Sequence, residues 1–157
     1  MVDGFMNMIK QRLKPDHHRI VHVLIICIAA LLVYSNTLNV PFQLDDIDTI
    51  VINPAIKDGR YFTDPSRVDS KERSRYFGFM TFGMNYALHG LDVRGYHAVN
   101  TLIHAGTALL LYWFIILTFR TPLFRAGSGS DDALLNSSRD FIALFSALFF
   151  AVHPSFC

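Results

Sequence analysis

The chain has 157 residues, of which 52% are hydrophobic and 13% are aromatic. Soluble domains typically contain about 45–50% apolar residues, so this composition favours a membrane protein. The formal net charge of +1 argues against nucleic acid as a partner, and the two cysteines, Cys27 and Cys157, do not form a disulfide framework.

The first apolar segment predicts a transmembrane helix. Residues 20–38 contain no Asp, Glu, Lys or Arg, and nineteen helical residues span roughly the 30 Å of a hydrocarbon core. The run is longer than the roughly 7–15 apolar residues of a signal peptide, and no small-x-small cleavage site follows it. Residues 1–19 carry four basic side chains, so we predict a cytoplasmic N-terminus over 1–19 and an uncleaved helix over 20–40.

Two further apolar segments follow. Residues 96–119 lack a formal charge and predict a second transmembrane helix, whereas residues 141–157 predict a truncated third span that Pro154 interrupts. The expected fold is therefore an all-α integral membrane protein with two full transmembrane helices and a truncated third. Residues 41–95 would form an extracytoplasmic loop and residues 120–140 a cytoplasmic loop. This multi-pass chain would reside in a plasma or inner membrane or in the endoplasmic reticulum.

The outer loop contains an apolar, aromatic stretch over residues 76–91 that is too short to cross a bilayer. Aromatic side chains collect at the level of the lipid headgroups. One interpretation is an interfacial helix that lies on the outer leaflet. The alternative is a core helix that packs on the neighbouring spans.

Three aspartates stand at the start of the outer loop: Asp45, Asp46 and Asp48. A carboxylate close to a low-dielectric membrane surface has its charged form disfavoured, which suits a general base. Neighbouring residues of an extended segment point to opposite sides. One of Asp45 and Asp46 would therefore face a reacting hydroxyl, and the other would orient it or pair with a cation. A solvated acidic turn is the simpler alternative, and it is our interpretation of Asp48.

Two arginines, Arg73 and Arg75, precede the aromatic stretch. Arginine binds phosphate through a fork of hydrogen-bond donors, so both are candidates for holding a lipid phosphate at the outer surface. Plain contact with lipid headgroups is the alternative.

The second apolar segment carries a polar face made of His97, Asn100, Thr101 and His104. Their spacings of three, four and seven place them on one side of a helix, and polar side chains within a membrane usually face the bundle interior or a cavity. His97 and His104 are separated by about 10.5 Å of helix rise, which is unsuitable for chelating one metal ion. We therefore predict no metal site here and expect interhelical hydrogen bonds, with His22 and His153 as candidate partners.

Three stretches resemble successive blocks of the C-type glycosyltransferases, which use lipid-linked sugars. They are NVPFQLDDIDTIVINPAI (39–56), RYFGFMTFGMNYALHGLDVRGYHAVNTLIHAGTALLLY (75–112) and ALFSALFFAVHP (143–154). More narrowly, they look like the group with trailing tetratricopeptide repeats, which includes the transmembrane and tetratricopeptide-repeat O-mannosyltransferases. The blocks come in order and with fitting spacing, although Tyr76 stands where the family often has proline.

The resemblance implies an α-helical membrane enzyme that transfers a sugar from a polyprenyl-phosphate donor to an acceptor hydroxyl, on protein or lipid, at the extracytoplasmic side. It places the functional acidic pair at Asp45 and Asp46, either of which would be the base, and it matches a family arginine at Arg75. The implied partners are the bilayer, the lipid-linked donor, and the further transmembrane helices and repeats of the family or other membrane subunits. It leaves a need for a divalent metal open. Because two and a half spans do not enclose a donor cavity, we expect this N-terminal part to be inactive alone.

Two other classes of protein remain as alternatives. A small non-catalytic membrane subunit or assembly partner would dock on other helices through His97, Asn100 and His104. A transporter fragment would use the intramembrane histidines as a proton or ligand site. Substitution of the aspartates and of His104 distinguishes these alternatives from a glycosyltransferase.

Overall fold

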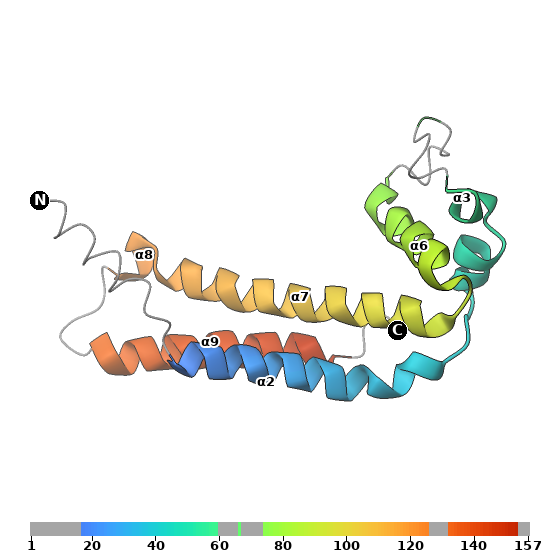
Figure 1. The fold of residues 1–157 in the computed structure, drawn as a ribbon. Coiled ribbons are helices and arrows are strands. Elements are labelled where there is room, and N and C mark those ends of the chain that lie inside the picture. Colours follow the sequence, from blue (N-terminus) through green and yellow to red (C-terminus); the bar gives the residue numbers. More distant parts are fainter. Residues whose placement is uncertain (1–16, 60–65, 67–73, 126–131, 154–157) are drawn as a thin grey trace, which may run out of the picture. The chain divides into compact units, whose positions relative to one another are not determined.

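The computed structural model describes residues 17–59, 66, 74–125 and 132–153. Every regular element in these ranges is a helix, and they contain no strand (Figure 1). The all-α class predicted from the sequence is therefore confirmed. The predicted phosphate ligand Arg73 and the interrupting Pro154 lie outside the described residues.

The first membrane-length helix is α2, His17–Tyr34, which continues as the 3-10 helix η1, Ser35–Asn39. Together they make 23 residues that are long and apolar enough to cross a bilayer. Proline drives the preceding residue out of the α region, and Val40, before Pro41, is extended with φ −71° and ψ 129°. The chain therefore leaves this helix in an extended conformation just before the three aspartates.

The second membrane-length helix is α7, Val93–Phe119, with 27 residues. It begins before the predicted first residue, Tyr96, because the carboxylate of Asp92 accepts a hydrogen bond from the amide of Arg94 at 3.1 Å. That bond caps the first turn of the helix. The two full spans predicted from hydropathy are thus present as two helices of membrane-spanning length.

A third long helix, α9, Asp132–Val152, contains the third apolar segment. It begins at Asp132, well before the predicted Phe141, and the short helix α8, Pro122–Arg125, precedes it in the chain. Apolar residues mark only the part of a helix that is buried or faces lipid. The hydropathy of the sequence therefore does not reveal the polar first turns of α9.

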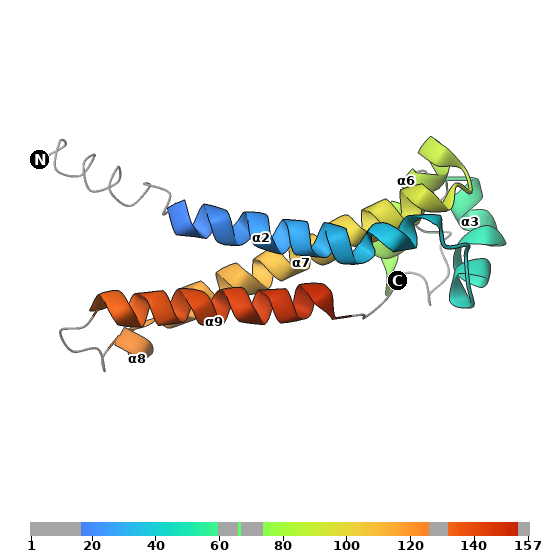
Figure 2. The same cartoon turned by 90° about the horizontal axis from the view of Figure 1, so that it is seen from below.

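The chain divides into two compact units, the first of which joins residues 1–31 to residues 104–153. Within it, α2 and α9 run in the same direction and α7 runs in the opposite direction (Figures 1 and 2). Three alanines of α9, spaced four residues apart, are fully buried: Ala143, Ala147 and Ala151. Such small residues on one helix face let neighbouring backbones approach closely. The rest of the buried core consists of Ile26, Ala30, Ala105, Ala108, Tyr112 and Ile116.

The second unit contains residues 32–103, which include all of the predicted outer loop over residues 41–95. Its short elements are the π-helix η2, Ile47–Val51, and the helix α3, Pro54–Lys57. The side chain of Asn53 accepts a hydrogen bond from the amide of Ala55 at 2.9 Å, so it caps α3. The buried core of this unit consists of Ile50, Ala55, Ile56, Phe79 and Tyr96.

The predicted loop helix is present as α6, Tyr76–His89. One face of α6 contributes Phe79 to the buried core, and Phe82 packs against that core. The opposite face exposes large apolar side chains, since Phe77 is 78% exposed and Leu88 is 74% exposed. The helix therefore has both a packed face and a free apolar face.

Candidate functional site

The acidic pair lies in a helical turn that leads into η2, and not in the extended segment that we expected. Asp46 has helical dihedral angles (φ −65°, ψ −32°), and its amide donates to the carbonyl of Gln43 at 2.9 Å. Its carboxylate accepts a hydrogen bond from the amide of Gln43 at 3.3 Å. This side-chain bond closes the turn in the way that the N3 residue of a capping box does, by reaching back to the amide three positions earlier. Since consecutive helical residues differ by about 100°, Asp45 and Asp46 do not point to opposite sides.

The two carboxylates have different surroundings. Asp46 is half-buried and its side chain bonds to the backbone, whereas Asp45 is exposed. No hydrogen bond or ion pair joins the Asp45 carboxylate to another described residue. Asp48 is exposed within η2. The turn also contains strain, because Leu44 adopts φ 44°, a conformation that is uncommon for residues other than glycine.

Arg75 stands at the first turn of α6, where it lines a surface hollow of about 480 Å³. Thr49 of η2 lines the same hollow, together with Ser74, Tyr76, Phe77, Gly78, Phe79 and Phe82. The first amide groups of a helix have no partner within the helix and carry partial positive charge. The hollow therefore combines an exposed guanidinium and a helix N-terminus with an aromatic wall.

The predicted polar face of α7 bonds mainly to backbone carbonyl groups of its own chain. In the second unit, the Nε2 of His97 donates to the carbonyl of Val40 at 2.9 Å. In the first unit, the Nε2 of His104 donates to the carbonyl of Ala151 at 3.2 Å. Asn100 is exposed. Of the three residues that a docking subunit would use, only Asn100 presents an exposed side chain.

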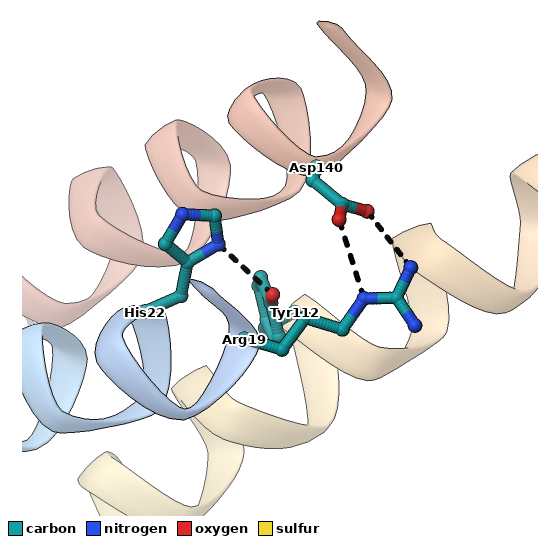
Figure 3. A network of polar contacts seen from close by, with 4 residues as sticks. All are labelled: Arg19, His22, Tyr112 and Asp140. Atoms are coloured by element: carbon teal, nitrogen blue, oxygen red, sulfur yellow. Dashed lines mark hydrogen bonds and ion pairs between the residues drawn. The ribbon is translucent and has the colours of Figure 1, made fainter. Parts of the chain in front are cut away.

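A polar network that was not predicted from the sequence joins three helices in the first unit (Figure 3). The Nε of Arg19 on α2 lies 3.2 Å from the Oδ2 of Asp140 on α9, and its Nη2 lies 3.4 Å from Oδ1. The Nδ1 of His22 lies 3.0 Å from the hydroxyl of Tyr112 on α7. His22 thus pairs with a tyrosine and not with a histidine of the polar face. The available signal was the placement of Arg19 and Asp140, each directly before an apolar segment.

Sequence comparison relates the chain to protein O-mannosyl-transferases. Over 149 residues it is 32% identical to protein O-mannosyl-transferase Tmtc3 of Drosophila melanogaster, covering 83% of this chain and 15% of that protein. It is 29% identical over 145 residues to a protein O-mannosyl-transferase of Caenorhabditis elegans, covering 85% of this chain and 19% of the relative. It is 30% identical over 136 residues to Tmtc1 of Drosophila melanogaster, covering 80% and 14%. No family model and no solved structure matches the chain.

The relatives confirm the resemblance to O-mannosyltransferases that the three sequence blocks indicated. The chain spans less than one fifth of the length of each of these relatives. Together with the two helices of membrane-spanning length, this relationship shows that the chain is a membrane protein homologous to a segment of the Tmtc-type protein O-mannosyl-transferases.

Proposed function

We propose that this chain is the N-terminal part of a membrane glycosyltransferase. The enzyme would transfer a sugar from a polyprenyl-phosphate donor to an acceptor hydroxyl at the extracytoplasmic side. The names of the relatives, protein O-mannosyl-transferases, favour mannose as the sugar and a protein hydroxyl as the acceptor. One observation carries the proposal: Thr49, in the helical stretch that follows the acidic turn, lines the same hollow as Arg75. Carboxylates and a cationic hollow thus lie on adjoining elements.

Within the acidic pair, we assign the role of base to Asp45. Its carboxylate is exposed, whereas that of Asp46 holds the amide of Gln43. In an inverting transfer, Asp45 would take the proton of the acceptor hydroxyl as that oxygen bonds to the anomeric carbon. The bond between the sugar and the donor phosphate then breaks, and the phosphate leaves with the electron pair. Asp46 would maintain the turn that presents Asp45.

The leaving phosphate needs cations or amide donors rather than an acid. Arg75 supplies a guanidinium fork next to the N-terminus of α6, and both favour an anion. Arg73, two positions earlier in the chain, would be a second phosphate contact. The aromatic wall of the hollow would lie against the apolar part of the lipid-linked donor.

The proposed topology places residues 1–19 and 120–140 in the cytoplasm and residues 41–95 outside, in a plasma or inner membrane or the endoplasmic reticulum. The ion pair between Arg19 and Asp140 supports it, because these residues end the two segments assigned to the cytoplasm. In this arrangement the part of α9 from Phe141 to Val152 would belong to the truncated third span proposed for residues 141–157. The exposed apolar face of α6 would lie in the outer leaflet as an interfacial helix.

A matched set of aspartate variants tests the function. Because relatives are much longer than this chain, we expect transfer to need their remaining helices, and the chain alone to be inactive. The chain would therefore replace the matching segment of Drosophila Tmtc3, and membranes would be assayed for transfer from polyprenyl-phosphate mannose to a serine-containing peptide. Asp45→Asn should lower the transfer rate by about 100-fold or more, Asp46→Asn less, and the control Asp48→Asn not at all. Full activity of Asp45→Asn, or an inactive unsubstituted chimera, would contradict the proposal.

A further inference from the structure

Residues 39–42, which lead into the acidic turn, are attached to the first turns of α7. Three contacts make the attachment: Arg94 Nε donates to Asn39 Oδ1 at 3.0 Å, His97 Nε2 donates to the Val40 carbonyl at 2.9 Å, and the Phe42 ring meets the Tyr96 ring edge-on at 5.2 Å. The contact of Arg94 is exposed to solvent. His97, in contrast, is only 8% exposed, so its bond to Val40 is the polar attachment that water competes with least.

The hydrogen bond to Val40 determines which tautomer a neutral His97 ring adopts. A carbonyl oxygen only accepts, so Nε2 carries a hydrogen, and in the neutral ring Nδ1 is an acceptor. Nδ1 is buried and has no hydrogen-bond partner among the residues that the structure describes. An unpaired buried polar atom lowers stability. A histidine at this position therefore gives the fold no clear advantage in stability over an apolar ring, and its bond to Val40 needs another explanation.

The position of Val40 provides that explanation. The amide of Val40 donates to the carbonyl of Thr37 in η1 at 3.0 Å, and the carbonyl of Val40 accepts from His97. Both backbone polar groups of Val40 are therefore hydrogen-bonded. Pro41 follows, and four residues later the chain reaches Asp45 through the strained Leu44, with φ 44°. Such a conformation persists only where the flanking chain is held in place.

We propose that His97 is a positioning residue for the acidic turn. Through the Val40 carbonyl, it holds residues 41–46 in the conformation that presents the Asp45 carboxylate. The inference rests on the proposed function for its catalytic meaning, since Asp45 is the base only in that proposal. The effect of His97 on the conformation of residues 41–46 is a property of this chain, and it can be measured without any sugar transfer.

The test uses a spin label on the full chain in phosphatidylcholine vesicles. Gln43, which is exposed, becomes the single cysteine for labelling, with Cys27 and Cys157 replaced by serine. The variants are His97→Phe, which keeps an aromatic ring but loses the donor, and His97→Gln, which keeps an N–H donor at a similar reach. His104→Phe is the matched control, because His104 lies on the same helix and also donates to a backbone carbonyl.

We expect the label at residue 43 to gain a mobile spectral component in His97→Phe, and to keep the parental spectrum in His97→Gln and His104→Phe. A label at the exposed Ser137 of α9 should be unaffected by all three changes. The unfolding midpoint of His97→Phe should change little, because the change removes the bond to the Val40 carbonyl but also removes the unpaired Nδ1.

Three outcomes would overturn the inference: an unchanged label at residue 43 in His97→Phe, equal mobilisation at residues 43 and 137, or no rescue by His97→Gln. The two proposals fail separately. If the label responds as expected but the Asp45→Asn chimera still transfers sugar, His97 holds a turn that has no catalytic role. If the label does not respond but Asp45→Asn is inactive, the base stands and the positioning role of His97 is wrong.

Discussion

Arg19 and Asp140 are 121 positions apart in the chain, and they form a two-point ion pair that joins the beginning of α2 to α9 (Figure 3). Each side chain is 18% exposed, so the pair is mostly shielded from water. Breaking such a pair costs more than breaking a surface ion pair, because removal of one partner leaves a poorly solvated charge behind. It joins two helices of the first unit that run in the same direction (Figures 1 and 2).

Removal of either partner should therefore lower stability. Arg19→Ala or Asp140→Ala should each cost about 1.5–3 kcal/mol of unfolding free energy, the usual range for hydrogen bonds to charged groups. Unfolding in mixed micelles of mild and denaturing detergent, followed by circular dichroism, measures the change. The exchanged double variant Arg19→Asp/Asp140→Arg should recover part of the loss, and losses that simply add would count against a direct pair.

The bond between His22 and Tyr112 should contribute less. Interhelical hydrogen bonds in membrane proteins average about 0.6 kcal/mol, so Tyr112→Phe should lower the unfolding free energy by about that amount. Tyr112 is fully buried, and Tyr112→Ala should cost about 3–5 kcal/mol, since it leaves a cavity. Similar losses for both variants, in the same unfolding assay, would show that the hydroxyl and not the ring dominates.

The row of alanines on α9 should not tolerate a larger side chain. Ala147 is fully buried between Ala143 and Ala151, and Ala147→Leu should cost about 1–3 kcal/mol through overpacking. Phe145→Leu is the control on the same helix, because Phe145 is 75% exposed. A neutral Ala147→Leu would mean that α9 does not pack closely in the first unit.

Gly95 should be required for the close contact of α6 with α7. A methyl group at Gly95 would lie 2.8 Å from the Oδ1 of Asn85, which has little room to move at 4% exposed, and 3.2 Å from the Nδ1 of His89. We expect Gly95→Ala to destabilise the second unit by about 1–3 kcal/mol. A methyl group at Gly106, also on α7, would have no neighbouring atom within 4 Å. Gly106→Ala should therefore raise the unfolding free energy by up to about 1 kcal/mol. Thermal unfolding of both variants checks this, and equal effects would refute the steric explanation.

Arg75 should act through its fork of donors and not through charge alone. In the chimera with Tmtc3, Arg75→Lys should raise the KM for polyprenyl-phosphate mannose by about tenfold, because lysine keeps the charge but cannot bind phosphate bidentately. Arg120→Lys is the control, because Arg120 directly follows the C-terminal end of α7 and does not line the hollow at Arg75. It should leave the KM unchanged. An unchanged KM in Arg75→Lys would remove Arg75 from the donor site.

The amino-acid sequence by itself determined the helical class, the two membrane-length helices, the presence of a helix at residues 76–89 and the resemblance to the O-mannosyl-transferases. These properties depend on composition, on the length of uncharged runs and on ordered motifs, all of which are local along the chain. Even so, the beginnings of α7 and α9 were misplaced, because a cap such as Asp92 and a polar first turn leave no trace in hydropathy.

Only the tertiary structure decided how the polar side chains are used. The acidic pair was expected on an extended segment, but the bond between the Asp46 carboxylate and the amide of Gln43 makes it a helical turn. The partners of His22, His97 and His104 lie 47 to 90 positions away in the chain. No spacing rule within one helix reaches that far, since hydrogen bonds of this kind depend on which segments fold against each other. The sequence could therefore identify the polar side chains, whereas the fold decided which of them are bonded to the backbone and which remain exposed.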